Sequence, residues 1–271
     1  MSLEYAPKGL IGLLTPQANT TVEPEMAVMV PPGLAVLNAR LCSDKPGIEA
    51  RLVDYFDGYD AALGQFANAP LTAAGFACTG ASYLAGVARE DASLAAMSAR
   101  TGVPVITAAT AVVDALRALE ARRIALVSPY FEALDRASEA YWQARGFEVS
   151  VLVSAWRETD AFHPIYSLGA AEAEATLARL QRVPEGATDV GEAGGPVRAA
   201  FDAVVMLGTG MPTLGPIAHR PRLDGAPVLS CMFCLGWRLV TAAQGLRADR
   251  DSLGAFLDDP GWRRRLAGMA G

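Results

Sequence analysis

The sequence alternates between short apolar runs that end in polar or small residues and longer stretches whose apolar residues recur at helical spacing. Such alternation of strands and amphipathic helices predicts parallel sheets that are covered by helices on both faces. One stretch, 183–197, is rich in Gly, Glu and Pro and lacks either pattern, so we expect a surface loop, with a lid as the alternative. The expected strands are 9–14, 34–41, 73–78, 103–107, 123–130, 148–154, 201–207 and 227–230; the expected helices begin near 23 and cover 47–65, 90–100, 110–122, 131–145, 170–180 and 236–243.

The order of elements in the first half of the chain repeats in the second half. A turn of small residues follows the third strand of each half, Cys78 to Gly80 in one and Gly208 to Gly210 in the other. We therefore expect an α/β fold with two pseudo-symmetric lobes, each a short parallel sheet flanked by helices. Ligands of parallel sheets bind at the carboxyl ends of the strands, which places the active site between the lobes. The expected lobes are residues 1–112 plus 235–271 and residues 113–234.

The turn after the third strand of the first half carries a thiol. Cys78 ends an apolar run and is followed at once by Thr79, Gly80 and Ser82. A thiol at a strand end, beside backbone N–H groups that can hold an anion, can serve as a nucleophile or a proton donor. Many single cysteines are simply small buried hydrophobic residues, so a structural role for Cys78 is the alternative.

Composition limits the partners and the compartment. The net charge is −6, and no cluster of Lys and Arg with interleaved aromatic residues argues for nucleic acid as a partner. No apolar run approaches the roughly 18 residues that would span a membrane. The first residues lack a secretory pattern, and the four cysteines lack the spacing of a disulfide framework. We therefore expect a cytoplasmic protein that does not associate with membranes.

Other chemical motifs are weaker. Cys231 and Cys234 form a C-x-x-C, which can be a redox pair or half of a metal site, but no second pair accompanies it. His163 and His219 are the only histidines, too few for a zinc site or a His-based triad. Gly208 and Gly210 lack the remaining glycine of a dinucleotide-binding fingerprint, because position 213 is Thr. The sequence therefore predicts neither a metal nor an organic cofactor.

The stretch 12–23, Gly-Leu-Leu-Thr-Pro-Gln-Ala-Asn-Thr-Thr-Val-Glu, resembles the amino-terminal signature of maleate cis-trans isomerases. The resemblance continues through Cys78, 127–130 and 211–214 and covers about residues 9–240. Its Pro-x-x-Asn-Thr-Thr motif together with the cysteine at the strand end is the specific part. These isomerases share a superfamily of cofactor-independent enzymes with arylmalonate decarboxylases and with hydantoin and Asp/Glu racemases.

The resemblance implies two similar lobes around a small carboxylate site, with one cysteine from each lobe. The first cysteine falls on Cys78, whereas the second position holds Gly208. Racemases of this superfamily use two opposed thiols, so the glycine argues against amino-acid racemisation. Arylmalonate decarboxylases carry a single cysteine in the second lobe and a glycine in the first, the mirror of the arrangement here. Members of the superfamily also lead us to expect a homo-oligomer.

The resemblance also implies roles for individual residues. Asn19 matches a carboxylate-binding Asn, and Tyr130 matches a substrate-binding Tyr. A further substrate-contacting Asn falls near Asp160, where a carboxylate would repel an anionic substrate unless it were protonated. The expected substrate-binding residues are Asn19, Thr79, Gly80, Tyr130, Gly208, Thr209 and Gly210, with Pro16, Asp160 and Met211 as further candidates.

These residues support three hypotheses about function. In the first, Cys78 adds to the double bond of a maleate-like dicarboxylate and catalyses cis-trans isomerisation. In the second, the chain decarboxylates substituted malonates, and Cys78 delivers a proton to the product carbanion. In the third, the chain binds a small acid without catalysis. The lobe that carries the cysteine and the amino-terminal motif favour the isomerase.

Overall fold

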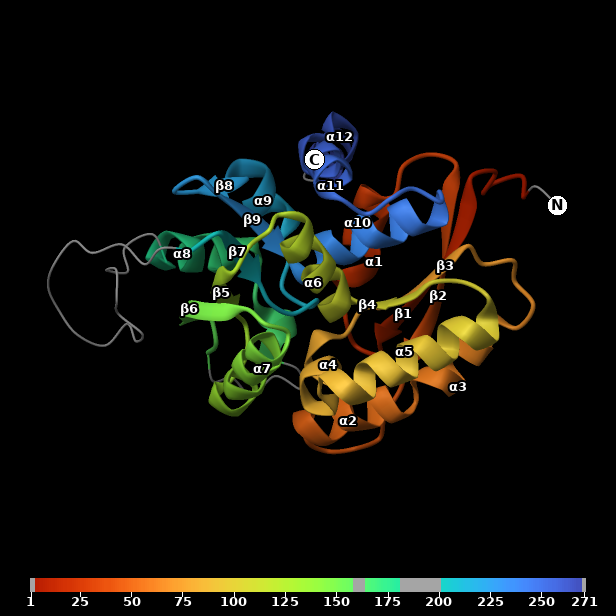
Figure 1. The fold of residues 1–271 in the computed structure, drawn as a ribbon, viewed down its shortest axis with the longest axis horizontal. Helices are drawn as coiled ribbons and strands as arrows, with labels where there is room; N and C mark the ends of the chain where they lie inside the picture. The colour runs from red at the N-terminus through yellow and green to blue at the C-terminus, as the bar shows by residue number, and fades with distance from the viewer. Residues whose placement is uncertain (1–2, 158–163, 181–200, 270–271) are drawn as a thin grey trace, which may run out of the picture.

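A computed structural model of the chain describes residues 3–157, 164–180 and 201–269 and contains two sheets that lie side by side (Figure 1). The first sheet has the order β2-β1-β3-β4 and consists of β1 (Gly9–Pro16), β2 (Leu34–Leu41), β3 (Ala73–Phe76) and β4 (Val105–Thr107). The second has the order β6-β5-β7-β9-β8 and consists of β5 (Arg123–Ser128), β6 (Glu148–Ser154), β7 (Ala203–Met206), β8 (Arg222–Leu223) and β9 (Ala226–Ser230).

Helices flank both sheets, so the predicted fold class, two α/β lobes, is confirmed. All strand pairs are parallel except the short β8, which pairs antiparallel with β9 and closes one edge of the second sheet. The helices are α1 (Val22–Met29), α2 (Ile48–Asp57), α3 (Tyr59–Leu63), α4 (Thr79–Ala85), α5 (Val87–Thr101), α6 (Ala108–Ala118), α7 (Glu132–Ala144), α8 (Ala170–Leu180), α9 (Leu214–His219), α10 (Cys231–Ala243), α11 (Arg250–Asp258) and α12 (Pro260–Met269).

The helix predicted over 47–65 is not continuous. It breaks at Gly58 into α2 and α3, and a 3-10 turn over Gly64–Phe66 follows. Glycine has a low helix propensity because its backbone loses the most conformational freedom on ordering. The break turns α3 toward the first sheet, where the ring of Tyr59 stacks on Phe76 with their centroids 3.8 Å apart.

Helix α4 was not predicted, and α10 begins earlier in the chain than predicted. The turn expected after Cys78 is the start of α4, and the helix expected from residue 236 begins at Cys231. The Ser230 hydroxyl accepts a hydrogen bond from the Phe233 N–H (3.0 Å), which caps α10 at its amino end. The C-x-x-C therefore lies in the first turn of a buried helix, and its two thiols are free.

Helix α10 packs against β1, β3, β4, β9 and α6, so it joins elements of both sheets. The sequence did not predict α9, α11 or α12, which cover the end of the molecule beside α10 (Figure 1). The predicted loop over 183–197 lies outside the described residues, and the predicted lobe boundaries stay a prediction. In the described part of the chain, no helix has both the length and the apolarity needed to cross a membrane.

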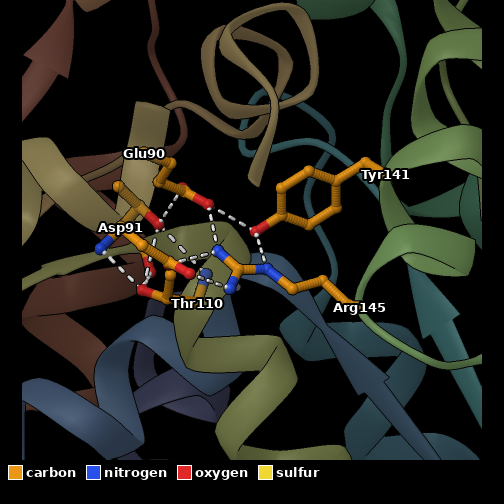
Figure 2. Close-up of polar contacts among 6 residues, drawn as sticks. Glu90, Asp91, Thr110, Tyr141 and Arg145 are labelled. Atoms are coloured by element: carbon orange, nitrogen blue, oxygen red, sulfur yellow. Dashed lines mark hydrogen bonds and ion pairs between the residues drawn. The ribbon is translucent and has the colours of Figure 1, made fainter. Parts of the chain in front are cut away.

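A buried polar cluster ties α5 of the first lobe to α7 of the second (Figure 2). The Glu90 carboxylate accepts hydrogen bonds from the Arg145 guanidinium (2.7 Å) and the Tyr141 hydroxyl (2.6 Å). Arg145 also contacts Asp91 through two nitrogens, at 2.8 and 2.9 Å. Glu90 is fully buried, and the Arg145 side chain is only 7% exposed. Because a buried ion pair tolerates little displacement, this cluster fixes how the two helices meet.

A set of aromatic side chains lies between this cluster and the space between the lobes. The ring of Tyr83 in α4 packs against Tyr141 and Trp142 of α7, with centroids 5.2 and 5.7 Å apart. On its other side it meets the ring of Tyr130 edge to face at 6.1 Å. Aromatic contacts of this kind fix ring orientation as well as burying area. The cluster between the lobes thus reaches Tyr130, a predicted site residue.

Candidate active site

A cavity lies where the carboxyl ends of β1, β3, β5 and β7 converge, as the sequence predicted for a site between the lobes. Eight of the predicted site residues line it: Pro16, Cys78, Thr79, Gly80, Tyr130, Gly208, Thr209 and Gly210. Asn19 and Met211 are buried next to this set but do not line the cavity. Asp160 lies outside the described residues.

Cys78 occupies the N-cap position of α4, on the first-lobe wall of the cavity. Cys78 is 5% exposed, and its carbonyl accepts a hydrogen bond from the Tyr59 hydroxyl at 3.3 Å. Burial raises the pKa of the Cys78 thiol to about 12, although the backbone N–H of Ala81 opposes the shift. The resting group is therefore a neutral thiol, next to the first-turn N–H groups of α4 that have no partner within the helix.

Gly208 stands on the opposite wall, where the resemblance would place a second cysteine. Its φ is +79°, a conformation that residues with a side chain rarely adopt. A Cβ at this position would lie 2.9 Å from Cγ of Pro129 and 3.3 Å from the Tyr130 hydroxyl oxygen. A side chain at this position would therefore require a strained backbone and a shift of Pro129, so the glycine suits this wall.

Tyr130 follows β5, and its hydroxyl reaches across to the first lobe. The hydroxyl oxygen lies 2.8 Å from Oγ1 of Thr79, the first residue of α4. Its backbone is held by serine side chains, because the Tyr130 N–H donates to Oγ of Ser128 (3.1 Å) and its carbonyl accepts from Oγ of Ser154 (3.2 Å). Burial raises the pKa of the Tyr130 hydroxyl well above its ordinary value, so it stays a neutral donor.

Asn19 connects the amino-terminal motif to the second wall. Its side-chain nitrogen donates to the Thr209 carbonyl (3.1 Å) and lies 3.3 Å from Oγ1 of Thr209. Its side-chain oxygen accepts from the N–H groups of Thr21 (2.9 Å) and Val22 (3.1 Å) at the start of α1. The Thr21 hydroxyl in turn donates to the Gly210 carbonyl at 2.7 Å. The motif therefore holds the 208–210 turn, and a direct contact of Asn19 with substrate stays a prediction.

A buried carboxyl group supports the same wall from α1. Glu25 accepts hydrogen bonds from the N–H groups of Thr213 (2.6 Å) and Leu214 (3.0 Å), where α9 begins. Burial raises the pKa of Glu25 to about 7, and the bonds from Thr213 and Leu214 partly offset the shift. Glu25 was not predicted from the sequence, although it lies only two residues beyond the motif.

The residues on one side of the cavity were not predicted from the sequence. Helix α2 contributes four lining residues, and the 3-10 turn Pro164–Ser167 contributes two. The four residues of α2 recur at helical spacing in the sequence, which shows that they share one face of the helix. The residues concerned are Ile48, Arg51, Leu52, Tyr55, Ile165 and Tyr166.

Cys231 of the C-x-x-C lies next to Gly208 and Thr79, two residues that line the cavity. Cys231 is fully buried and does not line the cavity. Burial raises the pKa of its thiol to about 12, and the Gly208 N–H and the Thr79 hydroxyl oppose the shift as hydrogen-bond partners. Cys234 is fully buried as well. Of the two histidines, His219 is exposed and paired with Glu174 at 2.7 Å, and His163 lies outside the described residues.

The sequence model of the arylmalonate decarboxylase family matches residues 11–244. Arylmalonate decarboxylase of Bordetella bronchiseptica is 30% identical over 265 residues, which cover 90% of this chain and 99% of that enzyme. The chain belongs to the arylmalonate decarboxylase family. Membership confirms the resemblance that the motifs around Asn19 and Cys78 carried.

The chain is also similar to maleate isomerases. Maleate isomerase of Pseudomonas putida is 29% identical over 150 residues, 51% of this chain and only 60% of that enzyme's length. A solved Nocardia farcinica maleate cis-trans isomerase, a cysteine-to-serine mutant with a covalently bound succinylcysteine intermediate, superposes with a TM-score of 0.68. It is 25% identical, and the match covers 88% of this chain and 93% of the other. The relatives are thus enzymes of the maleate isomerase and arylmalonate decarboxylase group.

Proposed function

We propose that the protein is an isomerase of a small unsaturated dicarboxylate, such as maleate, and that Cys78 is its nucleophile. One observation carries the proposal: the first-lobe thiol lines the cavity, while the opposite wall has Gly208, where a side chain would be strained by positive φ and by a Cβ contact of 2.9 Å with Pro129. The Nocardia isomerase mutant supports it, because that protein holds a succinylcysteine although one of its cysteines is serine. In that protein the covalent step thus does not need the replaced cysteine.

The reaction runs as addition and elimination. The Cys78 sulfur bonds to one carbon of the cis double bond, and the π electron pair moves to the other carbon, where the adjacent carboxylate delocalises it. The proton from the thiol ends on that carbon, so the adduct is a succinyl thioether. Rotation about the new single bond followed by the reverse steps returns the proton to sulfur and releases the trans isomer.

The neutral state of Cys78 fits this sequence, because the proton needed on carbon is already present on sulfur. The charge that develops on the substrate carboxylate needs preorganised donors nearby. The backbone N–H groups of Thr79 and Gly80 and the hydroxyl of Tyr130 line the same cavity and would supply them. Loss of one such donor typically raises a barrier by about 3 kcal/mol.

The test is a proton NMR time course of the protein with maleate. Wild type should convert maleate to fumarate, and Cys78→Ala should lower turnover by roughly 1,000-fold or more, because among the described residues no other thiol lines the cavity. Cys42→Ala is the matched control, since Cys42 is exposed and does not line the cavity. Fumarate formation by a folded Cys78→Ala variant would contradict the proposal.

Decarboxylation of substituted malonates is the second candidate. The neutral Cys78 thiol favours it, because a protonated thiol is ready to deliver a proton to a carbanion. If maleate stays unchanged, chiral chromatography of the product from a disubstituted malonate is the next measurement. With the thiol on the first-lobe wall, the product hand should be opposite to that of decarboxylases whose cysteine lies in the second lobe.

We also infer that the ligand is a small carboxylate, which the donors around the cavity favour. Assembly into a homo-oligomer and a cytoplasmic location are proposals that rest on the sequence alone. Sedimentation of the purified chain would test the first of these, and fractionation of cells would test the second.

A further inference from the structure

One face of α2 forms a wall of the cavity that the proposed chemistry does not yet use. Ile48, Arg51, Leu52 and Tyr55 lie three and four residues apart, and all four line the cavity together with Cys78. Ile48 and Leu52 are apolar, as expected for residues that pack toward a core. Arg51 and Tyr55, one turn apart on the same face, bring a positive charge and a hydroxyl group.

The Arg51 guanidinium is held at this wall by the chain that precedes α2. The residue is 2% exposed, and its Nη1 donates to the carbonyls of Lys45 (3.2 Å) and Pro46 (3.3 Å). These carbonyls orient the guanidinium at the wall of the cavity. Guanidinium geometry matches that of a carboxylate, so the group can accept an anionic ligand there.

The Tyr55 hydroxyl is a second donor at the same place. Tyr55 is 2% exposed, and its hydroxyl donates no hydrogen bond to any of the described residues, although the Gln17 N–H lies near enough to lower its pKa. Burial raises the pKa of Tyr55 to about 12, a negative charge at Cys78 adds to the shift, and Arg51 opposes it. The hydroxyl therefore stays protonated within electrostatic reach of both groups. A buried donor without a partner is unfavourable unless a ligand accepts its hydrogen bond.

We propose that Arg51 and Tyr55 bind the second carboxylate of the substrate and so select dicarboxylates whose carboxylates are on separate carbons. This inference rests on the proposed function for the identity of the substrate. One carboxylate would face the backbone donors near Thr79 and Gly208, and the other would face α2. An arylmalonate carries both carboxylates on one carbon and would place its apolar ring against Arg51, so the pair disfavours that class.

Binding measurements test the pair independently of catalysis. Isothermal titration with succinate, which has two separated carboxylates, and butyrate, which has one, reports on the second carboxylate alone. Arg51→Gln should weaken succinate binding roughly 10- to 100-fold and leave butyrate binding unchanged, as expected for loss of a charged hydrogen bond. Tyr55→Phe, which removes one oxygen, should weaken succinate binding by about 10-fold, and Arg51→Lys should restore part of the loss in Arg51→Gln.

Arg265→Gln is the matched control, because this guanidinium also donates to backbone carbonyls, of Val28 (2.6 Å) and Met29 (3.4 Å), but does not line the cavity. It should leave the binding of both acids unchanged. Equal affinities of wild type and Tyr55→Phe for succinate, or an equal loss of succinate and butyrate binding in Arg51→Gln, would overturn the inference. If wild type binds succinate through Arg51 but makes no fumarate, the proposed function fails and the anion site stands.

Discussion

The two walls of the cavity occupy corresponding places in the two lobes but are built differently. On the first wall the chain passes from β3 through Cys78 directly into α4, which packs against α2 and α7. On the second wall it leaves β7 through Gly208 and reaches the next helix only at Leu214. The first wall is thus a helix start that presents a thiol, and the second is an extended turn that presents backbone.

The second wall depends on side chains from the first lobe. Asn19, Thr21 and Glu25, all near the start of α1, bond to Thr209, Gly210 and Thr213 respectively. A hydrogen bond from Oγ1 of Thr209 to the Ala77 carbonyl (2.7 Å) joins the two walls directly. The two lobes therefore share the order of their elements but not the chemical groups that they place on the cavity wall. The proposed nucleophile, Cys78, belongs to one lobe, which also holds the opposing surface in shape.

The largest expected effect concerns Glu25, whose carboxyl group joins α1 to the second wall. The folded protein keeps the Glu25 proton up to about pH 7, whereas the unfolded chain releases it near the ordinary pKa of 4.5. The protonated Glu25 side chain therefore adds to the free energy of unfolding. This stabilisation is fully present below pH 4.5 and is lost as pH rises through 7. Its size is on the order of 3 kcal/mol, and Glu25→Gln should remove it.

Urea unfolding at pH 5 and pH 8 measures this contribution. Wild type should lose stability between the two values, and Glu25→Gln should lose less. Asp135→Asn is a comparison in the second lobe: burial also raises the pKa of Asp135 to about 7, so this variant should likewise lose less stability than wild type between the two pH values. The same pH dependence in wild type and Glu25→Gln would show that the second wall does not depend on this proton.

A smaller effect is expected when a side chain is added to the second wall. Gly208→Ala should lower the free energy of unfolding by about 2 kcal/mol, from positive φ and from the close approach to Pro129. Turnover should also fall, because the Tyr130 hydroxyl must move. Gly86 is a matched control: its φ is +76°, but a Cβ there would meet nothing within 4 Å. Gly86→Ala should cost about 1 kcal/mol and leave turnover unchanged.

Chemical denaturation and steady-state kinetics of both variants separate backbone strain from crowding. Equal losses in Gly208→Ala and Gly86→Ala would mean that the second wall has room for a side chain. In that case the absence of a second thiol would not be a structural requirement.

The sequence predicted the strands well, because a buried parallel strand is a continuous apolar run between turn residues. The limits of 34–41 and 148–154 agree with β2 and β6. It also predicted eight of the residues that line the cavity, since strand ends and the amino-terminal motif mark the site. Helix α4 was missed and the start of α10 was placed late, because Cys78 and Ser230 were not recognised as N-caps.

The rest of the site depends on contacts between distant segments, which a single sequence does not reveal. Arg51 and Tyr55 fit an ordinary amphipathic helix until the cavity shows which face of α2 is the inner one. Glu25 looks like a first-turn acidic residue, a common feature of exposed helices. Only the fold shows that α1 turns this residue toward Thr213, 188 positions along the chain.

The smallest effect should come from Asn19, which holds the second wall by direct hydrogen bonds to Thr209. Asn19→Ala removes these bonds and the acceptor for the first N–H groups of α1, so the free energy of unfolding should fall by about 1 kcal/mol. Asn38→Ala is a suitable control, because among the described residues its side chain only accepts a long hydrogen bond from Thr15 (3.5 Å), and Asn38 does not line the cavity. Asn19→Asp separates the two roles, since it keeps the acceptor for α1 but loses the donor to Thr209. If Asn19 acts by holding Thr209, both Asn19 variants should lower turnover while Asn19→Asp keeps more stability. A rise in KM for maleate in Asn19→Ala without loss of stability would instead place the Asn19 amide on the substrate, and the second wall would then hold its shape without it.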